Sequence, residues 1–231
     1  MQTGNQDPRA RDSQKTREAI LDAAEEVFAE HGFAGARIDS IARTSGYNSG
    51  LIFRYFGDKL GLYAEVLKRA DREVDELLAR VFTPWLENET AFSQAQQFRA
   101  LLETMIQTFF DYLLAHPRLV RILTWEMADG WQMLARITSQ LPAGNSEQFA
   151  TLFSKAWKAG LLRSAFLPKI QFSLVLQMCQ TFLASLPVYR ILLPDEKLAS
   201  GESLARVREY LIDFMVAGMM ADPERAKSLI P

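Results

Sequence analysis

Apolar residues recur every three or four positions along most of the chain, the spacing of one face of an α-helix. Runs that alternate apolar and polar residues, as strands do, are scarce. The pattern therefore predicts an all-α protein. Its first helix spans about 13–30 and ends at Gly32, with a buried stripe formed by Ile20, Ala23, Ala24, Val27 and Phe28.

Two short helices are expected next, at 38–44 and 49–55, joined by a four-residue turn that contains Gly46. A longer helix follows from Asp58, a favourable N-cap, and is expected to end at Pro84 because proline cannot donate the next helical hydrogen bond. Proline and glycine separate the later helices, which are predicted at about 92–115, 118–129, 131–139, 145–159, 168–186 and 203–220.

The composition is that of a folded globular protein, with 231 residues, 48% of them hydrophobic and 23% charged. Residues 1–14 are polar, lack the apolar core of a signal peptide and are expected to form a flexible arm. A single cysteine, Cys179, excludes an internal disulfide, so the expected compartment is the cytoplasm. The most apolar window, 170–186, is interrupted by three glutamines, and a core helix is expected there instead of a membrane span.

The paired short helices have the sequence form of a helix-turn-helix, in which the second helix enters the major groove of DNA. Ile41 and Ala42 of the first helix would face its partner, and Asn48, Ser49, Gly50, Phe53 and Arg54 would face outward. The net charge of the chain is −2, which does not announce a nucleic-acid partner, but residues 32–59 carry four bases against two acids. Any DNA site must therefore be local, with phosphate contacts expected from Arg37, Arg54 and Lys59, and from Lys15 and Arg17 of the first helix.

The stretch 16–66 resembles the DNA-binding domain of the TetR family of bacterial transcriptional regulators. The matching features are an Ile-Leu-x-Ala-Ala run ending in Phe-x-x-x-Gly-Phe, Ile41-Ala42, Gly46, Gly50, the aromatic cluster 53–56, and Lys59 with Leu62. The resemblance implies an N-terminal three-helix helix-turn-helix DNA-binding domain and a larger helical domain for ligand binding and dimerisation. The implied division is an arm at 1–14, the DNA-binding domain at 15–60, a linker helix at 61–84 and an effector-binding and dimerisation domain at 85–231.

In TetR-like proteins the second short helix reads DNA. The resemblance implies contacts from Arg37, Asn48, Ser49, Gly50, Leu51, Phe53, Arg54, Tyr55 and Lys59. Three positions depart from the family pattern. Ala36-Arg37 replaces small hydroxyl residues, Asn48-Ser49 replaces a common Ser-Lys pair, and Phe53 replaces a tyrosine and so lacks its hydroxyl. The operator sequence therefore cannot be taken from relatives.

Two further sets of residues are predicted in the C-terminal part. Large apolar side chains of the middle helices suit a hydrophobic or aromatic effector, and the candidate ligand-binding residues are Met105, Phe109, Tyr112, Trp125, Met127, Trp131, Phe153, Trp157 and Met178. Ordinary core packing is the alternative for most of them. Arg121 and Glu126 could orient a polar group of the effector or form an ion pair. The last two helices carry apolar stripes that predict a dimer interface formed by Leu174, Val175, Phe182, Leu186, Leu204, Val207, Leu211, Phe214 and Gly218.

The sequence contains few features typical of an enzyme active site. His31 and His116 belong to no metal-ligand or base motif, Cys179 lies on an apolar stripe, and no phosphate-binding or nucleophile motif is present, so neither a cofactor nor a metal is expected. The leading interpretation is a dimeric, ligand-responsive DNA-binding regulator that acts as a repressor, whose expected partners are double-stranded DNA, a small effector and a second copy. Two alternatives stay open: a helical small-molecule-binding or interaction protein that has lost DNA binding, and a helical enzyme.

Overall fold

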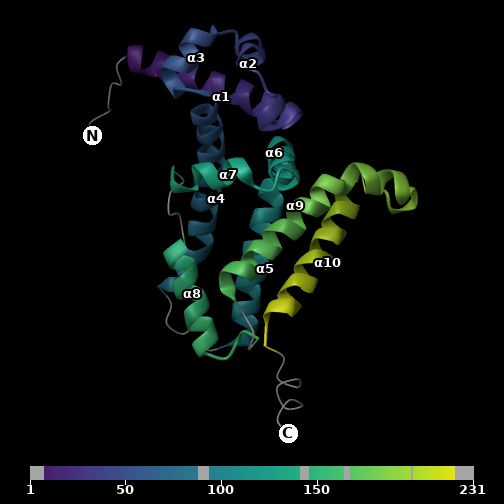
Figure 1. Ribbon diagram of the computed structural model, residues 1–231. Coiled ribbons are helices and arrows are strands. Elements are labelled where there is room, and N and C mark those ends of the chain that lie inside the picture. Colours follow the sequence, from purple (N-terminus) through teal and green to yellow (C-terminus); the bar gives the residue numbers. More distant parts are fainter. Residues whose placement is uncertain (1–7, 88–93, 141–145, 164–166, 199, 222–231) are drawn as a thin grey trace. The chain divides into compact units, whose positions relative to one another are not determined.

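The computed structural model describes residues 8–87, 94–140, 146–163, 167–198 and 200–221. Within these ranges the chain is helical, apart from one isolated bridge between Leu162 and Met220, so the all-α prediction is confirmed. The α-helices in Figure 1 are α1 (Pro8–Gly35), α2 (Ile38–Ser45), α3 (Ser49–Phe56), α4 (Lys59–Leu86), α5 (Ala95–Ala115), α6 (Pro117–Ala128), α7 (Gln132–Ile137), α8 (Ser146–Lys158), α9 (Pro168–Leu192) and α10 (Gly201–Met219). Short 3₁₀ turns follow α7 and α9, at Thr138–Gln140 and Pro194–Glu196.

Two prolines predicted to end helices lie inside them. Helix α4 continues past Pro84 to Leu86, and α9 continues past Pro187 to Leu192. Proline fixes φ at a helical value and removes one N–H donor, and near the end of a long helix the remaining bonds sustain the structure. Gly32 ends the regular part of α1 as predicted, since its φ of 65° and ψ of 178° are not helical.

The chain forms two compact units, which are described separately. The first comprises the described parts of Met1–Asp71 and Pro117–Pro142, and the second those of Arg72–His116 and Ala143–Pro231. This grouping differs from the division made on sequence, because α6 and α7 pack with the N-terminal helices and the boundary falls within α4. The sequence-based domain limits stay a prediction about independent folding.

Each unit has its own aromatic core. In the first, Phe28 packs edge-on against Tyr63 with ring centroids 4.9 Å apart, and both side chains are buried. In the second, Phe149 of α8 stacks on Phe153 at 4.3 Å and lies 4.6 Å from Phe172 of α9. The contacts of Phe28 with Tyr63 and of Phe149 with Phe172 join different helices, and such burial supplies most of the stability of a helical domain.

Charged side chains fasten α4 to α1 in the first unit. Arg69 bonds Asp22 at 2.6 Å and also pairs with Glu25, while Arg17 pairs with Glu65, which Lys68 contacts at 3.0 Å. Burial alone would raise the pKa of Glu65, but hydrogen bonds and charge from Lys68 and Arg17 outweigh it and lower that pKa. The Arg17 guanidinium thus pairs with Glu65 in the free chain, and its phosphate contact stays a prediction.

Replacing Glu65 by Gln should lower the free energy of unfolding by about 1 kcal/mol at pH 7. Because the folded-state pKa is lowered, the carboxylate stabilises the fold above its unfolded pKa of about 4.3, and this contribution is lost as pH falls through the folded value. Urea unfolding between pH 7 and pH 3 should show the deficit shrinking. Glu76→Gln, an exposed residue of the same helix, serves as control, and a pH-independent deficit would contradict the ionic interpretation.

Candidate nucleic-acid interface

Helices α2 and α3 lie beside α1 and form the predicted helix-turn-helix (Figure 1). Ile41 of α2 and Ile52 of α3 are fully buried and anchor the two helices to the core of the first unit. Gly46 ends α2 with φ 75°, the left-handed conformation that this tight turn requires and that side chains rarely adopt. The geometry leaves the opposite side of α3 open to solvent.

Local hydrogen bonds fix the N-terminus of α3. The Asn48 side-chain oxygen accepts a bond from the Leu51 backbone N–H at 2.9 Å, a standard N-cap. The Ser49 hydroxyl donates to Asp39 of α2 at 3.1 Å, so the two helices are joined at the end that would approach DNA. A Cβ at Gly50 would lie 3.3 Å from the capping oxygen of Asn48, a close contact that the glycine avoids.

Several predicted DNA contacts are solvent-accessible on this unit. Phe53 is 45% exposed, which is unusual for a phenylalanine, and Arg54 beside it is exposed. Arg37 occupies the N-cap position of α2 without a side-chain capping bond, so its guanidinium is not used there. Asn48 and Gly50 are exposed, and Ser49 and Leu51 are half-buried. An exposed aromatic ring between an arginine and a helix N-terminus is suited to contacts with DNA bases and phosphates.

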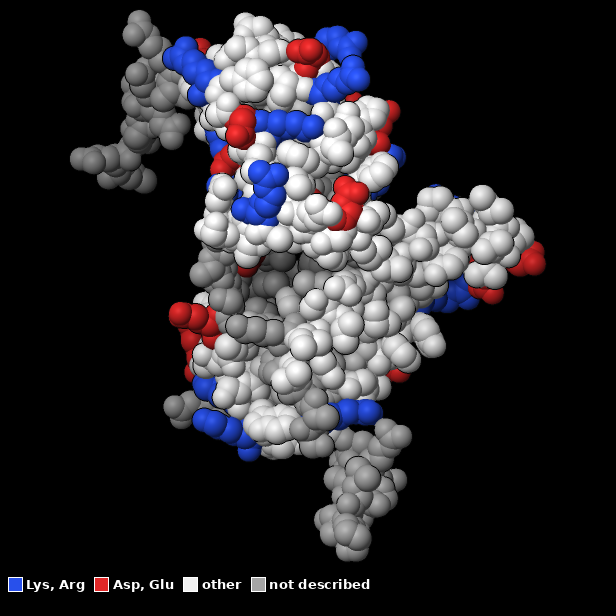
Figure 2. All heavy atoms as spheres, viewed as in Figure 1, with Lys and Arg blue, Asp and Glu red and all other residues white. Residues whose placement is uncertain are grey.

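Tyr55 and Lys59 have structural contacts as well. The Tyr55 hydroxyl lies 2.9 Å from the Ser13 hydroxyl and holds α3 against α1. The Lys59 ammonium sits 4.6 Å from the centroid of the Phe33 ring, and partial burial lowers its pKa. Both residues therefore help to position α3 and the start of α4, and their direct contact with DNA stays a prediction. Basic side chains are spread over the part of the molecule that carries α1–α3, with acidic ones among them (Figure 2).

Helix α6 packs on α1 at a point that the sequence did not identify. The Ala29 carbonyl accepts bonds from Arg121 Nε at 3.0 Å and Trp125 Nε1 at 3.3 Å. A Cβ at Gly32 would come within 3.0 Å of the Trp125 ring, so glycine permits this approach, and its positive φ adds a second reason for it. Arg121 and Trp125 thus hold α6 against α1, and contact of either with an effector stays a prediction.

A buried carboxylate completes this packing. Glu126 is 3% exposed and accepts bonds from the Tyr63 hydroxyl at 2.6 Å and the Leu134 N–H at 3.0 Å. Burial and the neighbouring carboxylate raise the pKa of Tyr63, so the phenol stays protonated and can donate. An acidic residue within the apolar helix was the available signal, and only the fold identifies its partner.

The nine predicted effector residues are divided between the two units. Met105, Phe109, Tyr112 and Phe153 are buried in the second unit, and Tyr112 donates to Glu73 at 2.9 Å. Trp125, Met127 and Trp131 lie in the first unit, where Met127 is 43% exposed, and Trp157 of α8 is 45% exposed. Met178 alone among the nine lines the cavity between α9 and α10 described below. Ligand contact by the others stays a prediction.

The predicted dimer residues divide by exposure. Leu174 and Phe214 are 52% and 58% exposed, and Gly218 is also open, whereas Val175 and Leu186 are buried within the chain. Phe182, Leu204, Val207 and Leu211 are half-buried, and Phe182 stacks on Tyr189. Sequence periodicity missed other exposed apolar residues of these helices: Ile170, Val188, Ile191, Leu192 and Tyr210. These five residues together with Leu174 and Phe214 form a surface that we call the α9/α10 face.

The α9/α10 face also explains an ambiguity in α9. The segment Ile170–Leu192 is long and apolar enough to cross a membrane by length and composition, and only 28% of its most apolar window is buried. The expectation of a core helix was therefore only partly right, because much of this apolar surface is solvent-accessible within one chain. Exposed apolar surface of this extent marks an interaction site.

Comparison with known proteins agrees with this geometry. Residues 20–66 match the family described as bacterial regulatory proteins, tetR family. Residues 20–66 are therefore similar to the DNA-binding domain of that family. This TetR-type domain comprises most of α1, all of α2 and α3, and the start of α4.

Curated relatives extend the similarity to about half the chain. The transcriptional repressor SCO4008 of Streptomyces coelicolor is 36% identical over 117 residues, which cover 51% of this chain and 52% of that protein. The repressor NicS of Pseudomonas putida is 32% identical over 126 residues, or 54% and 55% of the two chains. The chain thus spans about half the length of the curated relatives that it matches.

Solved TetR-like structures share the fold along most of the chain. SCO4942 from Streptomyces coelicolor superposes with a TM-score of 0.60 at 25% identity, covering 88% of this chain and 98% of that one. FadR from Bacillus subtilis, solved with stearoyl-CoA, gives a TM-score of 0.60 at 18% identity over 87% and 98% of the two chains. At such identity the second likeness concerns the fold alone.

The Asn48 cap allows a test of how this TetR-type domain is held. Asn48→Ala should lower the free energy of unfolding by about 1 kcal/mol, because the Leu51 N–H loses its acceptor. Asn48→Asp, which keeps an acceptor oxygen at the same position, is the control. Thermal unfolding followed by circular dichroism measures both, and equal destabilisation by the two variants would show that the cap does not account for the loss.

Proposed function

We propose that the chain is a ligand-responsive transcriptional regulator of TetR type, a repressor that binds a palindromic operator as a homodimer and is released by a small, largely hydrophobic effector. The observation that carries this is the capped helix α3, which presents exposed Phe53 and Arg54 within a domain that matches the family. The proposed location is the cytoplasm, where operator DNA is found, and the proposed activity is binding, without catalysis or a cofactor.

DNA recognition is proposed to rest on two kinds of contact. Arg54 and Phe53 on α3 would reach base edges or the adjacent sugars, while Arg37 and Lys59 would neutralise phosphates. Phosphate contacts give affinity that falls with salt, and only base contacts distinguish one duplex from another. The names of SCO4008 and NicS, both repressors, support the proposed sign of regulation.

Dimerisation is proposed to occur through the α9/α10 face. Two recognition helices must lie about 34 to 36 Å apart to occupy successive major grooves, so a fixed association of two copies is part of the function. The exposed apolar residues of α9 and α10 supply a surface whose burial between two copies would be favourable.

The solved complex of Bacillus subtilis FadR with stearoyl-CoA supports the proposal of a largely hydrophobic effector.

DNA binding is tested with duplex DNA from immediately upstream of the gene, by fluorescence anisotropy at increasing salt. Arg54→Ala should weaken binding about tenfold or more, since arginine contacts to bases contribute about 1–3 kcal/mol. Arg80→Ala, which removes an exposed arginine of the second unit, is the matched control. If no selective duplex emerges, even from a genome-wide operator selection, the proposal fails in favour of a helical binding protein that has lost DNA binding.

Dimerisation is tested by Leu174→Glu and Phe214→Glu, which place charges in the proposed interface. Sedimentation equilibrium should show a dimer for the unmodified chain and a large shift toward monomer for both variants, because each would bury an unpaired carboxylate. Leu114→Glu alters a residue of similar exposure on α5 and should leave the dimer intact. Dimers of unchanged stability in both α9/α10 variants would place the interface elsewhere.

A further inference from the structure

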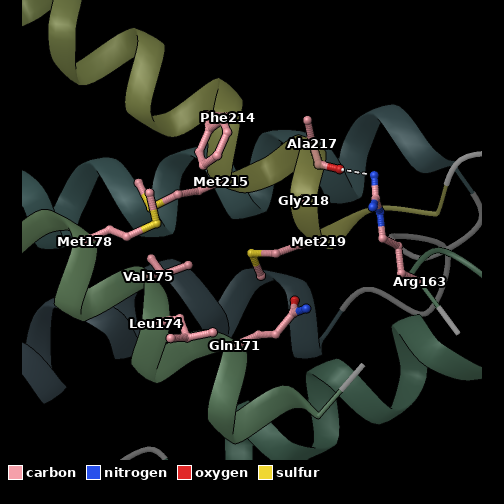
Figure 3. A pocket seen from close by; sticks show the side chains of 10 residues that line it. All are labelled: Arg163, Gln171, Leu174, Val175, Met178, Phe214, Met215, Ala217, Gly218 and Met219. Carbon is pink, nitrogen blue, oxygen red and sulfur yellow. Dashed lines mark hydrogen bonds between the residues drawn. The ribbon is translucent and has the colours of Figure 1, made fainter. Parts of the chain in front are cut away.

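A cavity of about 360 Å³ lies between α9 and α10 in the second unit. Its walls are apolar, with Leu174, Val175 and Met178 on α9 and Phe214, Met215 and Met219 on α10 (Figure 3). The volume falls within the range of about 300–1,000 Å³ typical of small-molecule sites. Three methionines give these walls flexible, polarisable surfaces that adapt to ligands of different shape.

Two polar groups belong to the cavity lining. Gln171 Oε1 is buried and has no hydrogen-bond partner among the described residues. Figure 3 shows the Gln171 amide on the side of the cavity where Met219 lies. A buried acceptor without a donor is unfavourable, so the site favours an occupant that brings an N–H or O–H to this oxygen.

Arg163 supplies a fixed positive charge at the same cavity. Its Nε donates to the Met220 carbonyl and its Nη2 to the Ala217 carbonyl, both at 3.1 Å, so the C-terminal end of α10 holds the guanidinium in place. Its third nitrogen, Nη1, makes no hydrogen bond within the described ranges, and it remains available to an anion. Figure 3 shows Arg163 beside Ala217 and Gly218.

We propose that this cavity is a binding site for a small amphipathic anion that carries an N–H or O–H donor. The apolar body would lie against the methionines and Leu174, the anionic group would approach Arg163, and the donor would bond Gln171. Identifying this ligand with the effector rests on the proposed function. A purely apolar side chain from a second copy would leave Gln171 unsatisfied, which favours a ligand over a partner residue as the occupant.

The cavity also shares residues with the proposed dimer interface. Leu174 and Phe214 belong both to the cavity wall and to the α9/α10 face, and Gly218 belongs to the cavity lining and to the predicted dimer residues. A ligand here would alter the surface that a second copy contacts. Ligand binding and dimer geometry would then be coupled through shared side chains, provided that the ligand binds one dimer arrangement more tightly than the other.

The probe for this site is 8-anilinonaphthalene-1-sulfonate, which has an apolar ring system, an anionic group and one N–H donor. Fluorescence titration of the full chain should give one saturable site per chain. Gln171→Leu keeps the size of the side chain but removes the acceptor, and it should weaken binding about tenfold. Gly218→Leu should reduce binding further by filling the cavity, since a Cβ at this position meets no atom within 4 Å.

Gly201→Leu is the matched control, because this glycine also lies on α10, has the same free space for a Cβ and is outside the cavity lining. It should bind the probe like the unmodified chain. Unchanged affinity in Gln171→Leu, or the absence of a saturable site, would overturn the proposal. Sedimentation of the same samples identifies the competing occupant: a dimer that Gly218→Leu dissociates, together with no probe binding, assigns the cavity to a second copy.

Operator binding measured on the same preparations separates the two proposals. If the unmodified chain binds its operator but binds no probe, the ligand assignment is overturned and the regulator stays in place. Probe binding with the expected variant pattern, but without any operator, supports the cavity and contradicts the proposed function.

Discussion

The close approach of α6 to α1 organises the first unit, which carries the helix-turn-helix. It requires glycine at position 32, because a Cβ there would meet the Trp125 ring at 3.0 Å and the backbone has a positive φ. It also involves the Ala29 carbonyl, which lies three residues before this kink and accepts bonds from two α6 side chains. The unit that carries the helix-turn-helix therefore includes a segment located nearly a hundred residues later in the chain.

This arrangement constrains how a signal could reach α3. The chain passes between the two units within α4, at the α5–α6 junction and again before α8, so the units are covalently connected three times. Because α6 is fixed to α1 and Glu126 is fixed to Tyr63 of α4, two of these connections enter the same packed core. A rearrangement of the second unit that displaces α5 would act on the elements that support α3. Such coupling also requires a ligand that binds the rearranged second unit with a different affinity from the original one.

The sequence predicted the local features well and the long-range ones poorly. The two short helices, the Gly46 turn and the end of regular helix at Gly32 depend on nearby residues and were located to within a residue or two. The contact between Trp125 and α1 spans 96 positions, and no periodicity encodes it. The packing of the Trp125 indole against Gly32 is thus visible only in the fold, and its ligand contact stays a prediction. The same limit applies to Tyr55, whose hydroxyl contacts Ser13 and whose contact with DNA stays a prediction.

The α9 helix shows why composition alone was ambiguous. The glutamines of this helix interrupt its apolar sequence and make a membrane span less favourable, and their environments in the folded chain differ from one another. Gln180 is 4% exposed and its Nε2 lacks a partner among the described residues, whereas Gln171 lines the cavity toward α10. Polar groups retained in an apolar helix cost stability unless something satisfies them. A helix that only packed against its neighbours would gain by replacing Gln171 with an apolar residue, so this glutamine fits the proposed occupant, which brings a hydrogen-bond donor of its own, whereas Gln180 lies outside the cavity lining.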